Sequence, residues 1–236
     1  MRIDEAYTAN DHEFRDTDVY AISKYRWTIR MLKKVGIEST ATIANVGCGS
    51  GTFTQMLADA GYSVLATEPD PEAFLVAATR VPANCEVRPI GLFDLVGQTF
   101  DVIVMHDVLE HIDPEGAALD KVKAILNPGG VFLMTVPALD QLYGHHDQQL
   151  GHFRRYSRSS VKRAMVGRLE VLNLRYFGFF SIPIVWLLSK KLRRDYPQSA
   201  VDGRSRAMKL YGLVCRFEER VRLPLGTSLM LVARNK

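Results

Sequence analysis

The stretch ATIANVGCGSG, residues 41–51, is an apolar run that ends in three alternating glycines, Gly47, Gly49 and Gly51. Residues 41–46 have the composition of a buried strand, and residues 52–60 have the apolar spacing of a helix. A strand that breaks at glycines and continues as a helix brings bare backbone and a helix N-terminus against a ligand. The stretch therefore predicts the first strand–turn–helix unit of an α/β fold, with a ligand at the turn.

An acidic residue, Glu68, closes the next apolar strand, residues 63–67, and follows the last glycine by 17 residues. Its carboxylate can accept hydrogen bonds from both hydroxyls of a ribose. The GxGxG spacing is shorter than the GxGxxG loop that binds a dinucleotide pyrophosphate. The pair of features therefore favours a nucleoside ligand without phosphates.

Apolar strands alternate with helical segments through the first part of the chain, which predicts a parallel sheet with right-handed crossovers. After residue 137 the pattern changes to a polar, His-rich loop over residues 143–156 and then a helix with its N-cap at Ser157 or Ser159. Residues 127–130, Asn-Pro-Gly-Gly, are expected to form a helix stop and a turn before the fifth strand. The seven expected strands span residues 41–46, 63–67, 85–90, 100–105, 131–136, 170–176 and 228–233.

Four segments in order, IANVGCGSG, ATEPD, FDVIVMHDVLEHI and LNPGGVFLMTVP, resemble the class I S-adenosylmethionine (SAM) methyltransferases, in their small-molecule branch. The resemblance implies a doubly wound, mostly parallel seven-stranded sheet with strand order 3-2-1-4-5-7-6. It also implies a helical N-terminal cover over residues 1–40 and a SAM-binding domain over residues 41–236. Within that domain, residues 177–226 are expected to form a helical insertion before the last strand.

The same resemblance implies which residues bind the cofactor SAM, whose product is S-adenosylhomocysteine. Asn45 stands where the family usually has an acid, and its amide can still bind the cofactor carboxylate. Backbone near residues 91–92, with Phe93 beside the ring, or Asp94 is expected at the adenine. The full predicted cofactor set is Asn45, Gly47, Cys48, Gly49, Gly51, Glu68, Pro69, Leu92, Phe93 and His106.

The segment His106 to His111 is expected at the carboxyl end of the fourth strand, where open α/β sheets place reactive groups. Asp107, Glu110 and His111 have spacing that could put them on one helical face. The triplet resembles the divalent-metal site of quinone-biosynthetic O-methyltransferases. We nevertheless expect a structural hydrogen-bonded pair and no metal, because Glu-His at this place is common in the wider family without one.

A second group of polar residues, HHDQQLGHFRRYS at 145–157, is expected to open at the same edge of the sheet. O-methyl transfer needs a base with a pKa near neutrality, and imidazole suits this role. The candidate catalytic residues are His106, His146 and His152. The candidate acceptor contacts are Tyr20, on a helix that could lie over the cofactor mouth, and Arg154, Arg155 and Tyr156. The alternative is a structural loop closed by Asp–Arg and His–backbone bonds.

The charge of the chain is divided unevenly along its length. Residues 1–140 hold 11 Lys and Arg against 20 Asp and Glu, whereas residues 141–236 hold 19 against 6. A basic half suits an anionic partner. The apolar stretch at 176–188 with the basic run at 190–194 could contact a membrane interface, or could be a core or dimer helix. The three cysteines are far apart and the N-terminus is polar, so we expect a cytoplasmic location with peripheral membrane contact through residues 176–194.

These features predict an O-methyltransferase that acts on a small anionic, lipid-linked or sugar-linked acceptor. Transfer to nitrogen or carbon of a natural-product or quinone-type substrate is the alternative of the same class. An RNA methyltransferase or a non-catalytic SAM-binding module are the alternatives of other classes. Nucleic acid is the less favoured partner, because the basic segment is not interleaved with exposed aromatic residues. The sequence leaves the oligomeric state open.

Overall fold

The computed structural model describes residues 18–193 and 206–236. Its centre is a seven-stranded sheet of order β3-β2-β1-β4-β5-β7-β6, which confirms the predicted topology. The five strands β1 to β5 run parallel to one another, and β7 pairs antiparallel with both β5 and β6. The strands are β1 Ile43–Val46, β2 Val64–Thr67, β3 Glu86–Arg88, β4 Phe100–His106, β5 Leu126–Pro137, β6 Glu170–Phe177 and β7 Ser228–Arg234.

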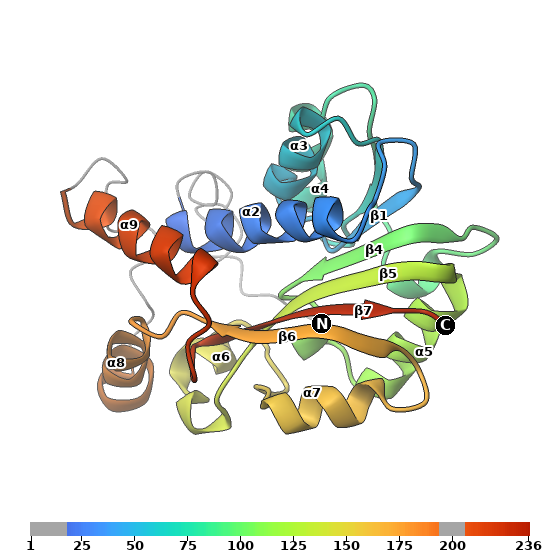
Figure 1. Cartoon of the computed structure of the whole chain (residues 1–236). Coiled ribbons are helices and arrows are strands. Elements are labelled where there is room, and N and C mark those ends of the chain that lie inside the picture. The colour runs from blue at the N-terminus through green and yellow to red at the C-terminus, as the bar shows by residue number, and fades with distance from the viewer. Residues whose placement is uncertain (1–17, 194–205) are drawn as a thin grey trace.

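Helices cover both faces of the sheet (Figure 1). The longer helices are α2 Val19–Lys34, α3 Thr52–Asp59, α4 Pro71–Arg80, α5 Glu115–Ile125, α7 Arg158–Met165 and α9 Arg206–Arg220. The shorter ones are α6 His145–Gln149, α8 Ile182–Val185 and a π-helix at Trp186–Leu192, with 3₁₀ turns at Leu92–Asp94, Leu109–His111 and Asp140–Leu142. One apolar core joins α5 and α7 to one face of the sheet, and a second joins α2 and α3 to the other.

Helix α2 lies across the sheet with α9 beside it (Figure 1). It begins where Asp18 accepts hydrogen bonds from the backbone N–H groups of Tyr20 and Ala21, at 2.9 and 3.2 Å. Trp27 and Leu32 are buried on its inner face. Helix α2 is the described part of the helical cover predicted over residues 1–40, and residues 1–17 lie outside the described residues. The described part of the insertion predicted over residues 177–226 contains α8, the π-helix and α9.

Two local expectations were wrong. Residues 127–130 do not form a turn before the fifth strand but a bulge within β5, because Leu126 already pairs with Phe100 and Val131 pairs with Val102. Asn127 Nδ2 fixes the bulge by donating to Asp101 Oδ1 at 2.8 Å. The segment predicted as a polar loop at 143–156 contains the short helix α6, where Asp147 accepts from the N–H of Gly144 at 3.0 Å.

Candidate active site

The glycine loop connects β1 to α3 and has the backbone conformation that only glycine adopts easily. Gly47, Gly49 and Gly51 have φ angles of +68°, +55° and +82°. A Cβ at Gly47 would lie 2.6 Å from Cγ2 of Val108, so the loop also touches the segment after β4. The glycines therefore set both the turn and its close approach to the neighbouring strand end.

Glu68 lies against this loop. The sequence predicted this position, because Glu68 follows the strand next to the loop. Its side chain is buried, and Oε2 accepts from the N–H of Gly49 at 2.7 Å while Oε1 accepts from the N–H of Asp70 at 3.0 Å. Burial and the charge of Glu68 raise the pKa of Cys48 to about 12, so that thiol stays protonated. Asn45 turns away from the loop and donates to Oγ1 of Thr54 at 2.9 Å.

The remaining predicted cofactor residues surround the ends of β2 and β3. Pro69 is exposed beside Glu68. Leu92 is buried, whereas Phe93 is 51% exposed in the 3₁₀ turn that follows β3. Asp94 accepts from the N–H of Gly91 at 2.9 Å and so closes this turn. Of the two alternatives for the adenine contact, Asp94 has a structural role in this turn, whereas the exposed ring of Phe93 is accessible to a ligand.

His106 is at the end of β4 and is enclosed by α2, α3 and β5. Its Nε2 lies 3.2 Å from Oγ1 of Thr28 and its Nδ1 lies 3.1 Å from Oγ1 of Thr135. The rings of Tyr25 and Phe53 stand edge-on to it at 5.0 and 4.6 Å. Burial lowers the pKa of His106 to about 3. The ring is therefore a neutral group held by two hydroxyls.

Asp107 does not share a face with Glu110 and His111, contrary to the expectation of a triplet. Its φ angle is +54°, which turns it out of the following 3₁₀ turn. Its carboxylate forms an ion pair with the buried Lys24 of α2 and accepts from Oγ1 of Thr135 at 2.9 Å. Burial alone would raise the pKa of Asp107, but the charge of Lys24 outweighs it and lowers that pKa.

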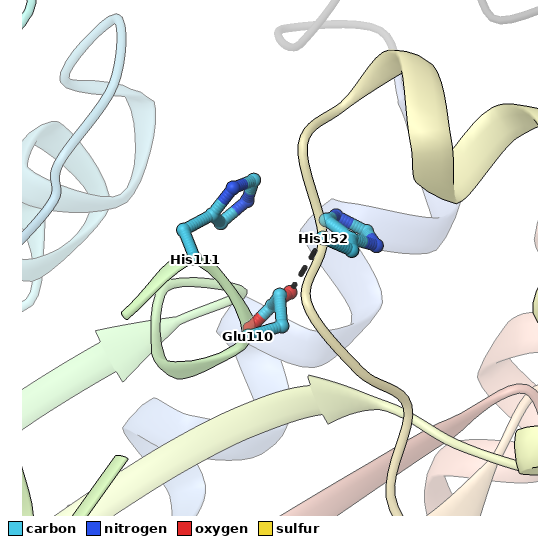
Figure 2. Close-up of side chains that lie close together, drawn as sticks. All are labelled: Glu110, His111 and His152. Carbon is cyan, nitrogen blue, oxygen red and sulfur yellow. Dashed lines mark ion pairs between the residues drawn. The ribbon is translucent and has the colours of Figure 1, made fainter. Parts of the chain in front are cut away.

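Glu110 and His111 instead meet His152, which comes from the loop before α7 (Figure 2). Oε1 of Glu110 lies 4.0 Å from Nε2 of His152, and the two imidazole rings stand edge to face at 4.7 Å. Among the described residues, neither oxygen of Glu110 has a hydrogen-bond partner. Burial, with the charge of Asp107 adding to it, raises the pKa of Glu110 well above its ordinary value. The expected hydrogen-bonded pair of Glu110 and His111 is therefore wrong.

His152 is oriented by an acid that is itself held in place. Its Nδ1 lies 2.9 Å from Oδ1 of Asp147, and Nε of Arg155 donates to the same oxygen at 2.8 Å. Burial raises the pKa of Asp147, but the bond with His152 and the charge of Arg155 outweigh this and lower it. His146 is buried one residue before Asp147, and its backbone N–H donates to Oγ of Ser189 at 3.2 Å.

The predicted acceptor contacts are mostly engaged with protein groups. Arg154 forms an ion pair with Asp113 and donates to the carbonyl of Ile112 at 2.9 Å. Arg155 also donates to the carbonyl of Ala138 at 3.2 Å. The hydroxyl of Tyr20 bonds to Thr227 and Ser228, and Tyr156 is buried in the core. These contacts are with other parts of the protein. For Arg154 and Arg155 they agree with the alternative of a structural loop closed by Asp–Arg bonds.

The family model of a methyltransferase domain matches residues 44–132, the part that contains the glycine loop, Glu68 and the segment after β4. Residues 44–132 are thus similar to a methyltransferase domain. An N-methyltransferase, NodS from Bradyrhizobium japonicum, solved with S-adenosyl-L-homocysteine, superposes on this domain with a TM-score of 0.61. It is 18% identical over 98% of this chain and 95% of NodS, a likeness that shows the fold.

Two further proteins are similar to this chain. A chain from the complex of the Haloferax volcanii Trm112 methyltransferase activator and a methyltransferase has a TM-score of 0.64 and 17% identity over 99% of both chains. A ubiquinone biosynthesis O-methyltransferase from Methylobacterium sp. (strain 4-46) is 29% identical over 96 residues, 39% of this chain and 39% of the relative. The chain spans about half or less of the length of the curated relatives that it matches.

Three residues of the candidate active site were missed from the sequence: Lys24, Thr28 and Thr135. They join Asp107 and His106 in one buried polar network, which Thr28 closes by donating to the carbonyl of Lys24 at 3.1 Å. A signal was present, because Lys24 and Thr28 share a helix face with the buried Ala21 and Leu32. A lysine on an apolar face requires an acidic partner, and the sequence alone did not show which acid.

Proposed function

We propose that this chain transfers the methyl group of SAM to an oxygen atom of a small-molecule acceptor. The observation that carries the proposal is the group formed by Glu110, His111 and His152, beside the glycine loop (Figure 2). The loop and this group are neighbours because Val108 packs against Gly47. The proposed methyl-donor site and the imidazoles proposed to accept the proton would therefore adjoin one another.

The proposed reaction is a displacement at the methyl carbon. The acceptor hydroxyl loses its proton at the group of Glu110, His111 and His152, and an oxygen lone pair attacks the methyl carbon. The carbon–sulfur bond breaks with its electron pair remaining on sulfur, which gives S-adenosylhomocysteine and a methyl ether. Because the sulfonium is already reactive, removal of the proton and alignment of the two reactants are the tasks left to the protein.

The proposed acceptor is anionic, lipid-linked or sugar-linked. Two observations support this class: the excess of Lys and Arg after residue 140, and the string HDQQLGHFRRYS, which resembles a branch often encoded with sugar and lipid-linked glycan pathways. Arg154 and Arg155 already have acidic partners, so the anion would meet other cations of the basic half. A neutral amine can attack the methyl carbon before it loses a proton, so its methylation depends less on a proton acceptor than that of a hydroxyl.

Calorimetric binding of SAM and S-adenosylhomocysteine tests the cofactor. We expect micromolar affinity, reduced about 10- to 100-fold in Glu68→Gln, because a hydrogen bond to a charged group contributes roughly 1.5–3 kcal/mol. Glu72→Gln is the matched control, since Glu72 is exposed on α4. A folded protein that binds neither compound would contradict the proposal.

Turnover with a responsive acceptor tests the role of His152. The acceptor is found by screening anionic and lipid-linked hydroxyl compounds for release of S-adenosylhomocysteine. His152→Gln keeps a donor for Asp147 but loses the proton acceptor, so we expect kcat to fall by about 100-fold or more while SAM affinity is kept. His145→Gln, in the same segment but outside the group, is the control. Equal loss in both variants would argue for a structural role.

The segment 182–193 is the proposed contact with a membrane surface. Ile184, Trp186 and Leu187 are each about half exposed, and Lys191 lies over the ring of Trp186 at 5.2 Å. Within the two described ranges, the structure contains no helix that is long and apolar enough to cross a bilayer. We propose a peripheral contact, which would bring the site near a lipid-linked acceptor.

A further inference from the structure

The carboxylate of Glu110 is the least satisfied polar group near the active site. The side chain is completely buried, and within residues 18–193 and 206–236 neither of its oxygens has a hydrogen-bond partner. Leaving such a group without a partner in the protein interior is costly, and buried polar groups are normally paired. A buried carboxylate that the protein itself leaves unsatisfied points to a ligand that binds there.

Two imidazoles from different parts of the chain lie near this carboxylate (Figure 2). His111 follows Glu110 in the 3₁₀ turn after β4, whereas His152 comes from the loop before α7. One ligand atom from each of the three residues lies within 4.8 Å of the other two. Metal–ligand bonds of about 2.0–2.2 Å place two ligands of one ion up to roughly 4 Å apart, so small side-chain rotations suffice.

The surroundings hold the imidazole of His152 in a ligating orientation. Asp147 bonds its Nδ1, which leaves Nε2 on the side of Glu110, 4.0 Å from Oε1. An acid bonded to the distal nitrogen is the usual outer partner of a metal-binding histidine. The backbone N–H of Phe153 also donates to the carbonyl of Glu110 at 2.9 Å, which joins the two segments directly. The donor set is thus preassembled.

We propose that Glu110, His111 and His152 form a binding site for one divalent transition-metal ion, with Zn²⁺ as the probe. Two imidazoles and one carboxylate suit Zn²⁺, Fe²⁺ or Mn²⁺ better than Mg²⁺ or Ca²⁺, which prefer oxygen ligands. Asp107 is not a ligand, because Lys24 and Thr135 hold its carboxylate. Three protein ligands leave a coordination position open. Provided that the proposed function holds, the acceptor hydroxyl would occupy it, which would lower the pKa of that hydroxyl, and its proton would pass to solvent because the three side chains would then be metal ligands.

Zinc binding to chelator-treated, full-length protein tests the site without SAM or an acceptor. We expect one Zn²⁺ per chain by calorimetry and by metal content after dialysis. Glu110→Gln and His152→Gln should each weaken the affinity by about 100-fold or more, since even outer-sphere partners contribute 10- to 100-fold. His145→Gln should bind as the unsubstituted protein does. Circular dichroism confirms that each variant is folded.

Two results would overturn the site: no Zn²⁺ bound by the unsubstituted protein, or equal affinity in the folded Glu110→Gln and His152→Gln variants. The zinc affinity of Asp107→Asn distinguishes this site from the triplet Asp107, Glu110 and His111 that was expected on one helix face. Retained affinity supports the set with His152, whereas a loss as large as that of Glu110→Gln would contradict it. Zinc binding without SAM binding would contradict the proposed methyl transfer and support the metal site. SAM binding without zinc binding would contradict the metal site and leave the proposed methyl transfer standing.

Discussion

At the scale of single residues, the buried network around His106 shows how this domain keeps an imidazole neutral. Its two nitrogens face the hydroxyls of Thr28 and Thr135, and aromatic rings fill the remaining space. Thr28 donates its proton to the carbonyl of Lys24 and Thr135 donates to Asp107, so both hydroxyls face the ring as acceptors. A neutral imidazole has one N–H and donates to one of them, and the other hydroxyl must turn its proton toward the ring to bond with it. The residue at the end of the fourth strand is therefore suited to shaping the site, and proton transfer is left to the group around Glu110.

The pH dependence of stability follows from this burial. Desolvation lowers the pKa of His106 from 6.5 to about 3, with Lys24 adding to the effect and Asp107 opposing it. The unfolded chain binds a proton on this ring below about pH 6.5 and the folded chain does not, so the ring's contribution is complete above that pH. It is lost as the pH falls from 6.5 toward 3, at up to about 1.4 kcal/mol per pH unit.

Urea unfolding at pH 7, 6 and 5 checks this prediction in the unsubstituted protein and in His106→Gln. Glutamine can keep hydrogen bonds to both threonines but does not titrate. We expect a shallower loss of stability with falling pH in the variant. Parallel pH profiles for the two proteins would show that His106 is not the group responsible.

At the scale of elements, the glycine loop is where local backbone geometry and tertiary contact coincide. Gly47 and Gly61 both have positive φ angles, but only Gly47 has a side chain, Val108, at the place of a Cβ. We expect Gly47→Ala to cost roughly 1–3 kcal/mol more than Gly61→Ala, because a clash is added to a similar backbone strain. Urea unfolding measures the difference, and equal costs would mean that Val108 moves aside freely.

The exposed apolar face of the helical insertion has a separate test. We expect the protein to sediment with anionic lipid vesicles, less so at high salt, and the double variant Ile184→Asp and Leu187→Asp to remain in solution. Leu75→Asp is the control, since Leu75 is 63% exposed on α4, away from this segment. Unchanged sedimentation of the double variant would exclude this face as the contact.

The sequence predicted those elements whose signals are local. Apolar runs and the glycine loop depend on near neighbours, so β1, the loop, α3 and the acid at the end of β2 could be placed from the residues alone. The bulge in β5 could not, because pairing of Leu126 with Phe100 is decided between strands. His152 with Glu110 could not be placed for the same reason: two segments distant in the sequence meet only after folding.

At the scale of the whole molecule, α2 is tied to the sheet too closely to act as a separate unit. Trp27 and Leu32 are buried in the core that α2 shares with α3 and the sheet, and Lys24 pairs with Asp107. Removing one partner of a buried ion pair costs about 3–5 kcal/mol, so such a contact opposes independent opening of the helix. The boundary expected near residue 40, between the N-terminal cover and the SAM-binding domain, therefore stays a prediction. We expect the two parts to unfold as one cooperative unit.

Tryptophan fluorescence can test that expectation. Trp27 is buried on α2 and Trp186 is 45% exposed on the insertion, and the chain has no other tryptophan. In Trp186→Phe, fluorescence reports on α2 alone, while far-ultraviolet circular dichroism reports on all helices and strands. We expect the two urea transitions to coincide. An earlier fluorescence transition would show that the N-terminal helix opens before the sheet.

The position of β7 in the sheet has a consequence for synthesis of the protein. Among the described strands, β6 pairs only with β7, and β7 also pairs with the edge of β5. As the nascent chain leaves the ribosome, β6 emerges first and has no neighbour, and the apolar edge of β5 is open as well. Both strand edges stay unpaired until the insertion and β7 have been translated. During this interval a chaperone would protect the chain from misassembly.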